Sequence, residues 1–318
     1  MEEEKKIENG IFVFDHSKLQ TQANNIPSEF IWPTSEIYHT QKELSEPLIG
    51  LQGFITGDES ATAEAVELIR TACLKHGFFQ VINHGVDVNL MNAAAEEIDT
   101  IFELPLEKKL SIPKKPGSPA SVHYLKSVLG QDFERTGWVY QRYCKSMQKL
   151  SGVIFEILAV SLGVDRMHFK DYFEDGSSIM RCKYYPPCDN SGLVLGTGPR
   201  SHPTALTILY QDQVGGLEVY TNNNWYSVRP RPDALLINLG DTFMWRTEIE
   251  TEDHWFSSLV QKKTKVVRPP EYLVLREGPR IYPDFTWSDL LNFTQKHYRP
   301  NFTALQSFVH WFSSSKNI

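Results

Sequence analysis

The chain has 318 residues, is 41% hydrophobic, and carries a net charge of −7 from 32 Lys and Arg against 39 Asp and Glu. This composition is typical of a folded globular protein, and its acidic balance gives no reason to expect nucleic acid as a partner. No run of about 18 apolar residues suggests a membrane span, and the charged start, Met1–Lys6, is unlike a secretory leader. We therefore expect a cytoplasmic protein without a membrane partner.

Helical patterns dominate the first half of the chain, after a polar stretch. Apolar residues at helical spacing predict helices over 62–76, 87–103 and 133–162, and the segment 78–85 has the composition of a strand. Gly77 is the stop signal of the first helix. The long pattern over 133–162 is typical of a helix that packs under a sheet as a spine.

The second half changes to short β patterns separated by Pro, Gly and Asn, which favours a sandwich or a jelly roll. We expect strands at 180–185, 205–210, 216–220, 225–229 and 234–239, and then helices at 287–297 and 302–313. The resulting fold class is α+β. The expected organisation is an irregular N-terminal segment (1–45), a helix and strand region (46–115), a linker with the spine helix (116–176), a jelly-roll region (177–270) and a helical tail (271–318).

The four cysteines, Cys73, Cys144, Cys182 and Cys188, show no spacing of the kind that zinc sites use. Cys182 and Cys188 lie six residues apart, and we interpret them as reduced, buried thiols.

Several long blocks resemble one family. The segment 179–188 (IMRCKYYPPC) is similar to the "NYYPPC" motif of plant iron/2-oxoglutarate dioxygenases, and 206–219 (LTILYQDQVGGLEV) is similar to their "LTILHQDQVGGLQV" block. The segments 76–86 and 238–244 match further blocks, and 282–298 resembles the tail of gibberellin 20-oxidases specifically. The resemblance covers nearly the whole chain from about Phe30.

This resemblance implies a double-stranded β-helix core (a jelly roll, cupin-like) with flanking helices. It implies Fe(II), 2-oxoglutarate and ascorbate as cofactors, and oxidation of C-20 of gibberellin precursors as the family reaction. The small-molecule partner would be a gibberellin-like carboxylic acid, and the protein would act as a monomer.

The family places two iron ligands as His-x-Asp before the "LTIL" block, and the residues at those positions differ here. Arg200 stands in the His position and His202 in the Asp position. Iron in this class needs two His and one carboxylate on one face, whereas a guanidinium keeps its proton and repels a cation. His202 remains as one candidate metal ligand; the alternative is a partly exposed residue before Pro203.

The third ligand position is also altered, because a gapless count puts Phe256 in the place of the family's His. His254 lies two residues earlier and is a candidate substitute, or part of a solvated acidic loop. No Arg occurs between Thr247 and Val267 to bind the distal carboxylate of 2-oxoglutarate.

The residues that could still contact 2-oxoglutarate are few. Lys183 replaces the Asn that usually precedes the paired tyrosines. Tyr185 and Ser258 remain as candidates, although Tyr185 is equally compatible with a core aromatic.

Two family segments are missing, one after Ser118 and one after Met244, so we expect the last core strands to be incomplete. The stretch 245–264 resembles a family segment read one nucleotide out of frame, and we hypothesise a frameshift, a splice variant or a faulty gene model. Two functions stay open at this point: an active oxygenase, or a catalytically inactive homologue that is at most a residual binder of a hydrophobic carboxylic acid. Non-redox chemistry in the old pocket is a third possibility.

Overall fold

The computed structural model describes residues 7–8, 11–12, 31–33, 37, 42–45, 47–110, 129–174, 176–178, 180–185, 191–198, 204–221, 224–243, 259–260, 266–268, 283–296 and 304–316. The helices are α1 (Gln52–Thr56), α2 (Glu59–His76), α3 (Val88–Phe102), α4 (Leu106–Leu110), α6 (Glu134–Ser161), α7 (His168–Phe173), α10 (Trp287–Lys296) and α11 (Ala304–Lys316), with 3-10 turns at Gln131–Phe133 and Ser191–Leu193. The strands are β1 (Ile7–Glu8), β2 (Ile11–Phe12), β3 (Leu48–Gly50), β4 (Phe78–Ile82), β5 (Ser177–Ser178), β6 (Leu206–Leu209), β7 (Glu218–Thr221), β8 (Asn224–Ser227), β9 (Leu235–Leu239), β10 (Leu259–Val260), β11 (Val266–Val267) and β12 (Phe285–Thr286).

The two helices that flank β4 in the sequence have capping residues at their ends. The Asp58 carboxylate accepts a hydrogen bond from the Ala61 amide at the start of α2, and Asp87 does the same for Asn89 at the start of α3. Gly77 ends α2 in the left-handed region at φ 69°, where a side chain would be strained. The helices predicted over 62–76, 87–103 and 133–162 are therefore confirmed as α2, α3 and α6.

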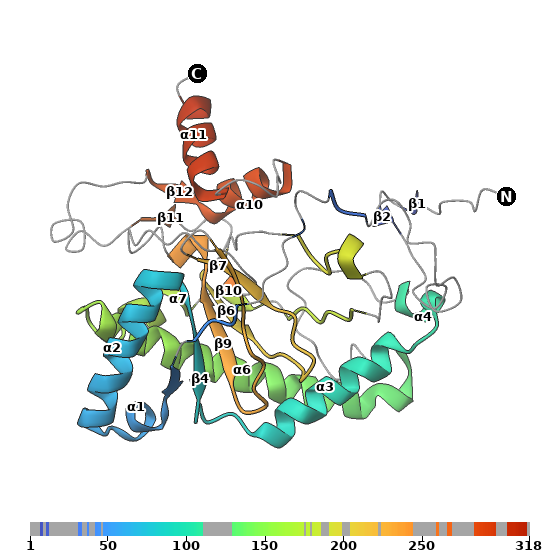
Figure 1. Cartoon of the computed structure of the whole chain (residues 1–318), viewed down its shortest axis with the longest axis horizontal. Coiled ribbons are helices and arrows are strands. Elements are labelled where there is room, and N and C mark those ends of the chain that lie inside the picture. The colour runs from blue at the N-terminus through green and yellow to red at the C-terminus, as the bar shows by residue number, and fades with distance from the viewer. Residues whose placement is uncertain are drawn as a thin grey trace.

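A four-stranded sheet forms the centre of the molecule in the order β3-β4-β9-β6 (Figure 1). β3 pairs with β4 in parallel, and β9 pairs antiparallel with both β4 and β6. β7 and β8 form a separate antiparallel pair. Segments that are far apart in the sequence therefore meet at β9, the central strand of the sheet.

Strand β9 is buried on both faces, which explains its almost continuous apolar sequence. Leu235, Ile237 and Leu239 face the main core, which contains the buried sides of α2 and α6. Leu236 faces the other way and packs with Val219 of β7 in a second cluster. The sheet is thus sandwiched between helices on one side and the β7–β8 pair on the other, as expected for a jelly-roll core.

Helix α6 runs along the sheet as the predicted spine (Figure 1). Its C-terminal half contributes Ile154, Phe155 and Leu158 to the main core. On the same helix, the buried Glu156 accepts hydrogen bonds from Arg166 at 2.7 Å and from Lys170 of α7 at 2.5 Å. These two cations compensate for the carboxylate's burial and fasten α7 to the spine.

One expectation about the β structure is wrong. The strands expected at 205–210, 216–220, 225–229 and 234–239 are present as β6 to β9, but 180–185 forms no strand. The nearby β5 pairs instead with β10, and residues 180–185 belong to none of the described strands. Within the segment 1–45, β1 and β2 pair antiparallel, with Ile7 opposite Phe12 and Glu8 opposite Ile11.

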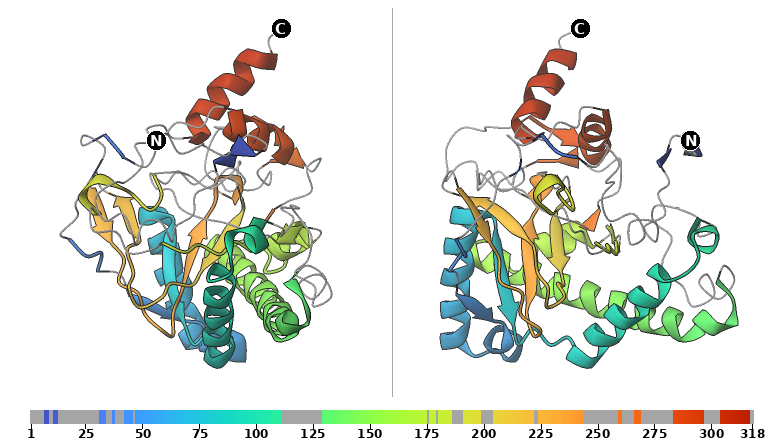
Figure 2. Two further views of the ribbon diagram at one scale, coloured as in Figure 1. Left: turned by 90° about the vertical axis from the view of Figure 1, so that its right-hand side faces the viewer. Right: turned by 45° about the vertical axis from the view of Figure 1, so that its right-hand side comes forward.

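The predicted helical tail is present as α10 and α11, which lie above the end of the sheet (Figure 2). They enclose their own aromatic cluster, in which Phe308 contacts Phe285, Phe293 and Phe312. Within the described residues, no helix is both long and apolar enough to cross a membrane.

We predict that Glu156→Gln lowers the unfolding free energy by about 1–2 kcal/mol at pH 7, because two cations lose their carboxylate. Burial raises the pKa of Glu156, but the hydrogen bonds from Lys170 and Arg166 outweigh it and leave the pKa below its usual range. The stabilisation is therefore present above the ordinary pKa of Glu and is lost as the pH falls through the lower, folded-state pKa. Urea unfolding at pH 7 and at pH 3 measures this.

The matched control is Glu174→Gln, which changes an exposed carboxylate just after α7. Equal effects of the two substitutions at pH 7 would contradict the role assigned to Glu156.

We also predict that stability falls between pH 7 and pH 5 because of His84, which is 5% exposed. Burial lowers the pKa of His84, partly offset by the backbone and charge of Asp233. The unfolded chain therefore binds more protons than the folded one below about pH 6.5, and stability is lost as the pH falls.

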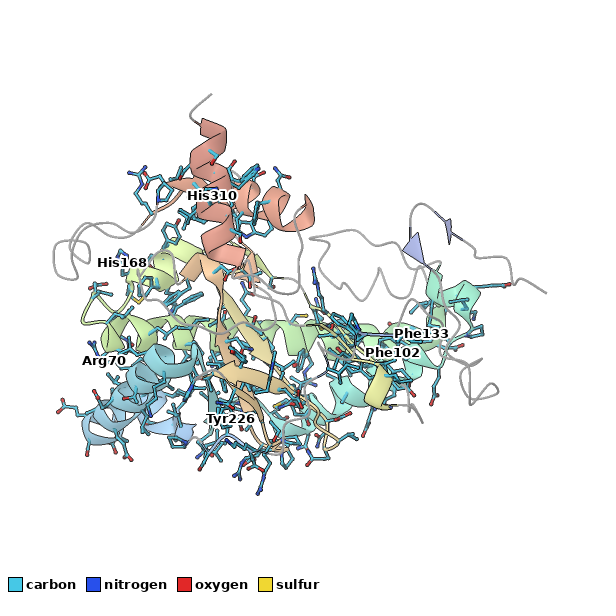
Figure 3. All side chains as sticks on the ribbon, turned by 45° about the horizontal axis from the view of Figure 1, so that its top comes forward. Arg70, Phe102, Phe133, His168, Tyr226 and His310 are labelled. Atoms are coloured by element: carbon cyan, nitrogen blue, oxygen red, sulfur yellow. The ribbon has the colours of Figure 1, made fainter. Side chains whose placement is uncertain are left out.

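The variant His84→Asn keeps an acceptor for the Val86 amide, which donates to Nδ1 of His84 at 3.2 Å, and it should flatten the pH dependence. His310→Asn, at an exposed position of α11 labelled in Figure 3, should not. An unchanged slope in His84→Asn would refute the assignment.

Candidate functional site

The residues predicted to stand in the positions of the family's first two iron ligands precede β6 in the sequence, and the structure describes the start of that strand. The Gly240 amide donates to the Ala205 carbonyl at 3.0 Å, and the Thr242 amide donates to the Thr204 carbonyl at 3.3 Å. The start of β6 is thus held against the end of β9. Arg200 and His202 precede this junction in the sequence and lie outside the described residues.

The interior between the two sheets contains polar groups near this junction. Thr207 and Asn238 are opposite each other in the β6–β9 ladder, on the side of β9 that faces β7. Both are buried, and Nδ2 of Asn238 has no hydrogen-bond partner in the part of the chain that the structure describes. A buried amide donor without a partner costs about 1–3 kcal/mol. The space between the sheets is therefore not a purely apolar core.

The chain that leads toward Arg200 is anchored by Trp32. The Trp32 amide donates to the Leu193 carbonyl at 3.0 Å. Its indole lies over Gly198, where an added Cβ would stand 2.2 Å from a ring carbon. Gly198 is buried, so only a residue without a side chain fits there.

The side chains of the two consecutive tyrosines, Tyr184 and Tyr185, contact different parts of the structure. Tyr184 stacks on Phe102 of α3 with ring centroids 5.4 Å apart; Phe102 is labelled in Figure 3. Tyr185 is 54% exposed, and its ring lies against the backbone of Gly196. The interpretation of Tyr185 as a core aromatic is therefore wrong, whereas its proposed contact with 2-oxoglutarate stays a prediction. Lys183, in the family's Asn position, is exposed.

The other candidates, Arg200, His202, His254 and Ser258, lie outside the residues that the structure describes. Among the described residues, no group of three or more His, Cys, Asp or Glu side chains is placed to hold a metal ion. At the positions themselves, Arg200 supplies a fixed cation where iron needs a neutral imidazole. The altered ligand positions therefore stay a prediction from the sequence.

The structure also brings together two sulfur atoms that the sequence pattern did not connect. Cys144 of α6 donates a hydrogen bond to Sδ of Met180 at 3.9 Å, and Cys182 follows two residues later. Cys73 is buried, but Cys144 and Cys182 are only half-buried, so the expectation of a buried thiol is wrong for Cys182. Cys188 lies outside the described residues. Thirty-six residues separate Cys144 from Met180, and no local spacing could have indicated their contact.

Comparison with known proteins identifies the family. Residues 176–255 match the 2OG-Fe(II) oxygenase superfamily, and residues 47–147 match the non-haem dioxygenase in morphine synthesis N-terminal family. The chain is 42% identical to gibberellin 20 oxidase 1-D of Triticum aestivum over 346 residues, which cover 94% of this chain and 96% of that protein. It is 41% identical to gibberellin 20 oxidase 1 of Arabidopsis thaliana over 347 residues, covering 94% and 92%. Both alignments are longer than the 318-residue chain, so they contain gaps where this chain lacks residues.

Solved structures agree on the fold. The crystal structure of JOX2 in complex with 2OG, Fe and JA has a TM-score of 0.74 at 26% identity and covers 92% of this chain and 97% of that one. The dioxygenase for auxin oxidation in rice has a TM-score of 0.63 at 21% identity, covering 82% and 99%. These likenesses confirm the expected double-stranded β-helix core with flanking helices.

The sheet sandwich, the two matched family regions and the identity along nearly the whole length support one assignment. This chain belongs to the gibberellin 20-oxidase group of the 2OG-Fe(II) oxygenase superfamily, a family that uses iron and 2-oxoglutarate.

Proposed function

We propose that this chain is a catalytically silent gibberellin 20-oxidase homologue, which keeps the scaffold but does not oxidise C-20 of a gibberellin precursor. At most it binds a hydrophobic carboxylic acid of the gibberellin type. The single observation that carries the proposal is Arg200 in the position of the first iron ligand.

The electrostatic consequence of Arg200 supports the proposal. Two unit charges of the same sign about 4 Å apart repel by about 4 kcal/mol at an effective dielectric constant of 20, and a doubly charged ion doubles this. A guanidinium cannot relieve the repulsion by losing its proton, because its pKa exceeds 12. The neighbouring His202 offers one nitrogen, which does not replace the lost pair of ligands.

The positions downstream of β9 support the same conclusion. Phe256 stands in the place of the third ligand, and no Arg between Thr247 and Val267 can pair with the distal carboxylate of 2-oxoglutarate. The altered positions therefore concern the binding of both iron and 2-oxoglutarate, and they extend beyond the single substitution at Arg200. We infer that ascorbate, which the family uses with iron, has no role here.

A second candidate function is retained oxygenase activity, which the identity over 94% of the chain favours. In that case His202 and His254 would ligate the metal, and Tyr185 and Ser258 would contact 2-oxoglutarate. Such a site would have two imidazoles and no carboxylate ligand among the residues that align with the family's positions.

We predict that Mn(II), used as a redox-inert substitute for Fe(II), shows no stoichiometric micromolar binding by calorimetry. With Fe(II), 2-oxoglutarate, ascorbate and a C-20 gibberellin precursor, succinate should stay at the level of a protein-free sample. Gibberellin 20 oxidase 1-D of wheat is the matched positive control. Micromolar binding of one equivalent, together with succinate formation, would overturn the proposal.

We predict further that the double replacement Arg200→His with His202→Asp does not restore succinate formation, because the third ligand and the 2-oxoglutarate Arg are still absent. It should restore at most weak Mn(II) binding, since two ligands hold a metal poorly compared with three. The single variant Arg200→His is the control that separates removal of the positive charge from restoration of a ligand pair. Turnover by the double variant would show that another residue already completes the site.

A further inference from the structure

Helix α6 carries a row of cations on its outer face. Arg142, Lys145 and Lys149 are exposed, and intervals of three and four residues align them along one side of the helix. Trp138, which is 54% exposed, lies four residues before Arg142 and extends the same row. Among the residues that the structure describes, none forms an ion pair with any of the three cations. We call these four residues the basic stripe.

Helix α3 carries acids at the same intervals. Glu96, Asp99 and Glu103 are exposed and again follow one another after three and four residues, so they too align along one side of their helix. Within the described ranges, these carboxylates have no ion-pair partner. We call these three residues the acidic stripe. The two stripes match each other in spacing and are opposite in charge.

The two stripes lie on opposite sides of the packed α3–α6 pair (Figures 1 and 2). The Thr136 hydroxyl of α6 donates to the carboxylate of Glu97, and Tyr140 packs with Ala94. These residues mark the faces by which the two helices contact each other. At about 100° of rotation per residue, each stripe falls on roughly the far side of its helix from that contact. The stripes of one chain therefore cannot pair with each other, and each remains available to another molecule.

The stripe residues differ from the charges that stabilise the fold. Arg135 pairs with Glu97 across the α3–α6 contact at 3.1 Å, and Glu156 is paired with two cations beside α7. No contact of this kind involves the stripes in the described part of the chain. Substitutions in the stripes should therefore change the stability of the fold little.

We propose that the basic stripe of one copy binds the acidic stripe of a second copy of this chain, so that the protein self-associates weakly and in a salt-dependent way. When the two helices lie parallel, the equal intervals set three ion pairs at once: Arg142 with Glu96, Lys145 with Asp99, and Lys149 with Glu103. Exposed ion pairs are individually weak, so the complex is transient. The inference is independent of whether the chain binds iron or 2-oxoglutarate.

Charge complementarity favours a second copy over a surface of anionic lipid. A lipid surface needs no particular interval between its cations, whereas a helix with carboxylates at intervals of three and four engages all three at once. This chain supplies such a helix in α3. The net charge of −7 on each copy opposes association. At about 0.1 M salt, however, this long-range repulsion is screened beyond about 10 Å, while ion pairs in contact are screened less.

The placement of the stripes also determines how copies add to one another. Because the stripes face away from each other, one copy contacts two neighbours through two different surfaces. Such a contact is heterologous and does not close on itself in a dimer. Copies therefore add stepwise, head to tail.

The test is analytical ultracentrifugation of the full chain over a series of protein concentrations. In about 0.1 M salt the average mass should rise with concentration as copies add stepwise, and in about 1 M salt it should be that of the monomer. The double variants Lys145→Glu with Lys149→Glu, and Glu96→Lys with Asp99→Lys, should each weaken the association at least about tenfold, because like charges then meet. An equimolar mixture of the two variants should associate again, since one presents two acidic stripes and the other two basic stripes.

The matched control is Glu64→Lys with Glu67→Lys, which makes the same change in net charge at exposed acids three residues apart on α2. It should associate at least as well as the parent chain. Circular dichroism of every variant should match the parent, because all the replaced residues are exposed.

The proposal is overturned if the parent chain remains a monomer at its highest soluble concentration in about 0.1 M salt, whether or not it binds phosphatidylserine vesicles. It is also overturned if the association persists in about 1 M salt or stops at a closed dimer. Association of either stripe variant at the parent's strength, a mixture that remains monomeric, or loss of association in the α2 control would equally refute it.

Discussion

The fold depends on the burial of strand β9 on both of its faces. Leu235, Ile237 and Leu239 pack against the helices, while Leu236 packs against the β7–β8 pair. At about 25 cal/mol for each Å² of apolar surface removed from water, the four buried apolar residues of this strand contribute a substantial part of the driving force for folding. The same strand also positions its neighbours. It pairs with β4 and β6 along its length, and the residues just after it hold the start of β6 by backbone hydrogen bonds.

We propose that the burial of β9 preserves the scaffold of a chain that has lost its reaction. The buried clusters around β9 are built from residues of α2, α6, β6 and β7, and Arg200 and His254 lie outside the described residues. Iron binding, in contrast, needs several donors at one point, and one guanidinium there is enough to disfavour a cation. The segments that this chain lacks relative to its relatives would remove sheet pairing and leave exposed strand edges, which lowers stability but does not touch β9.

The sequence predicted the long, periodic elements well, because local chemistry determines them. Asp58, Gly77 and Asp87 mark helix ends by their own hydrogen bonds and backbone preferences, and the apolar run Leu235–Leu239 is explained by burial on both faces. The strand expected at 180–185 was wrong, since β composition alone cannot supply a partner strand, and β10 pairs with Ser177 and Ser178 instead.

The candidate site was only partly predictable, for a physical reason. Family motifs located the ligand positions in the sequence, but contacts between distant segments follow from tertiary packing. The proximity of Cys144 to Met180, and the different contacts of Tyr184 and Tyr185, depend on how the segment 180–185 packs against α6, α3 and Gly196. No spacing within the chain encodes those contacts.

We propose that this scaffold no longer assembles iron and 2-oxoglutarate together. The most direct measurement is the visible absorption of the anaerobic protein with Fe(II) and 2-oxoglutarate, because the keto acid chelated to protein-bound iron gives a metal-to-ligand charge-transfer band. We predict no such band for this chain under conditions in which the wheat relative shows one. A band of comparable intensity, saturating at one equivalent of iron, would contradict the account.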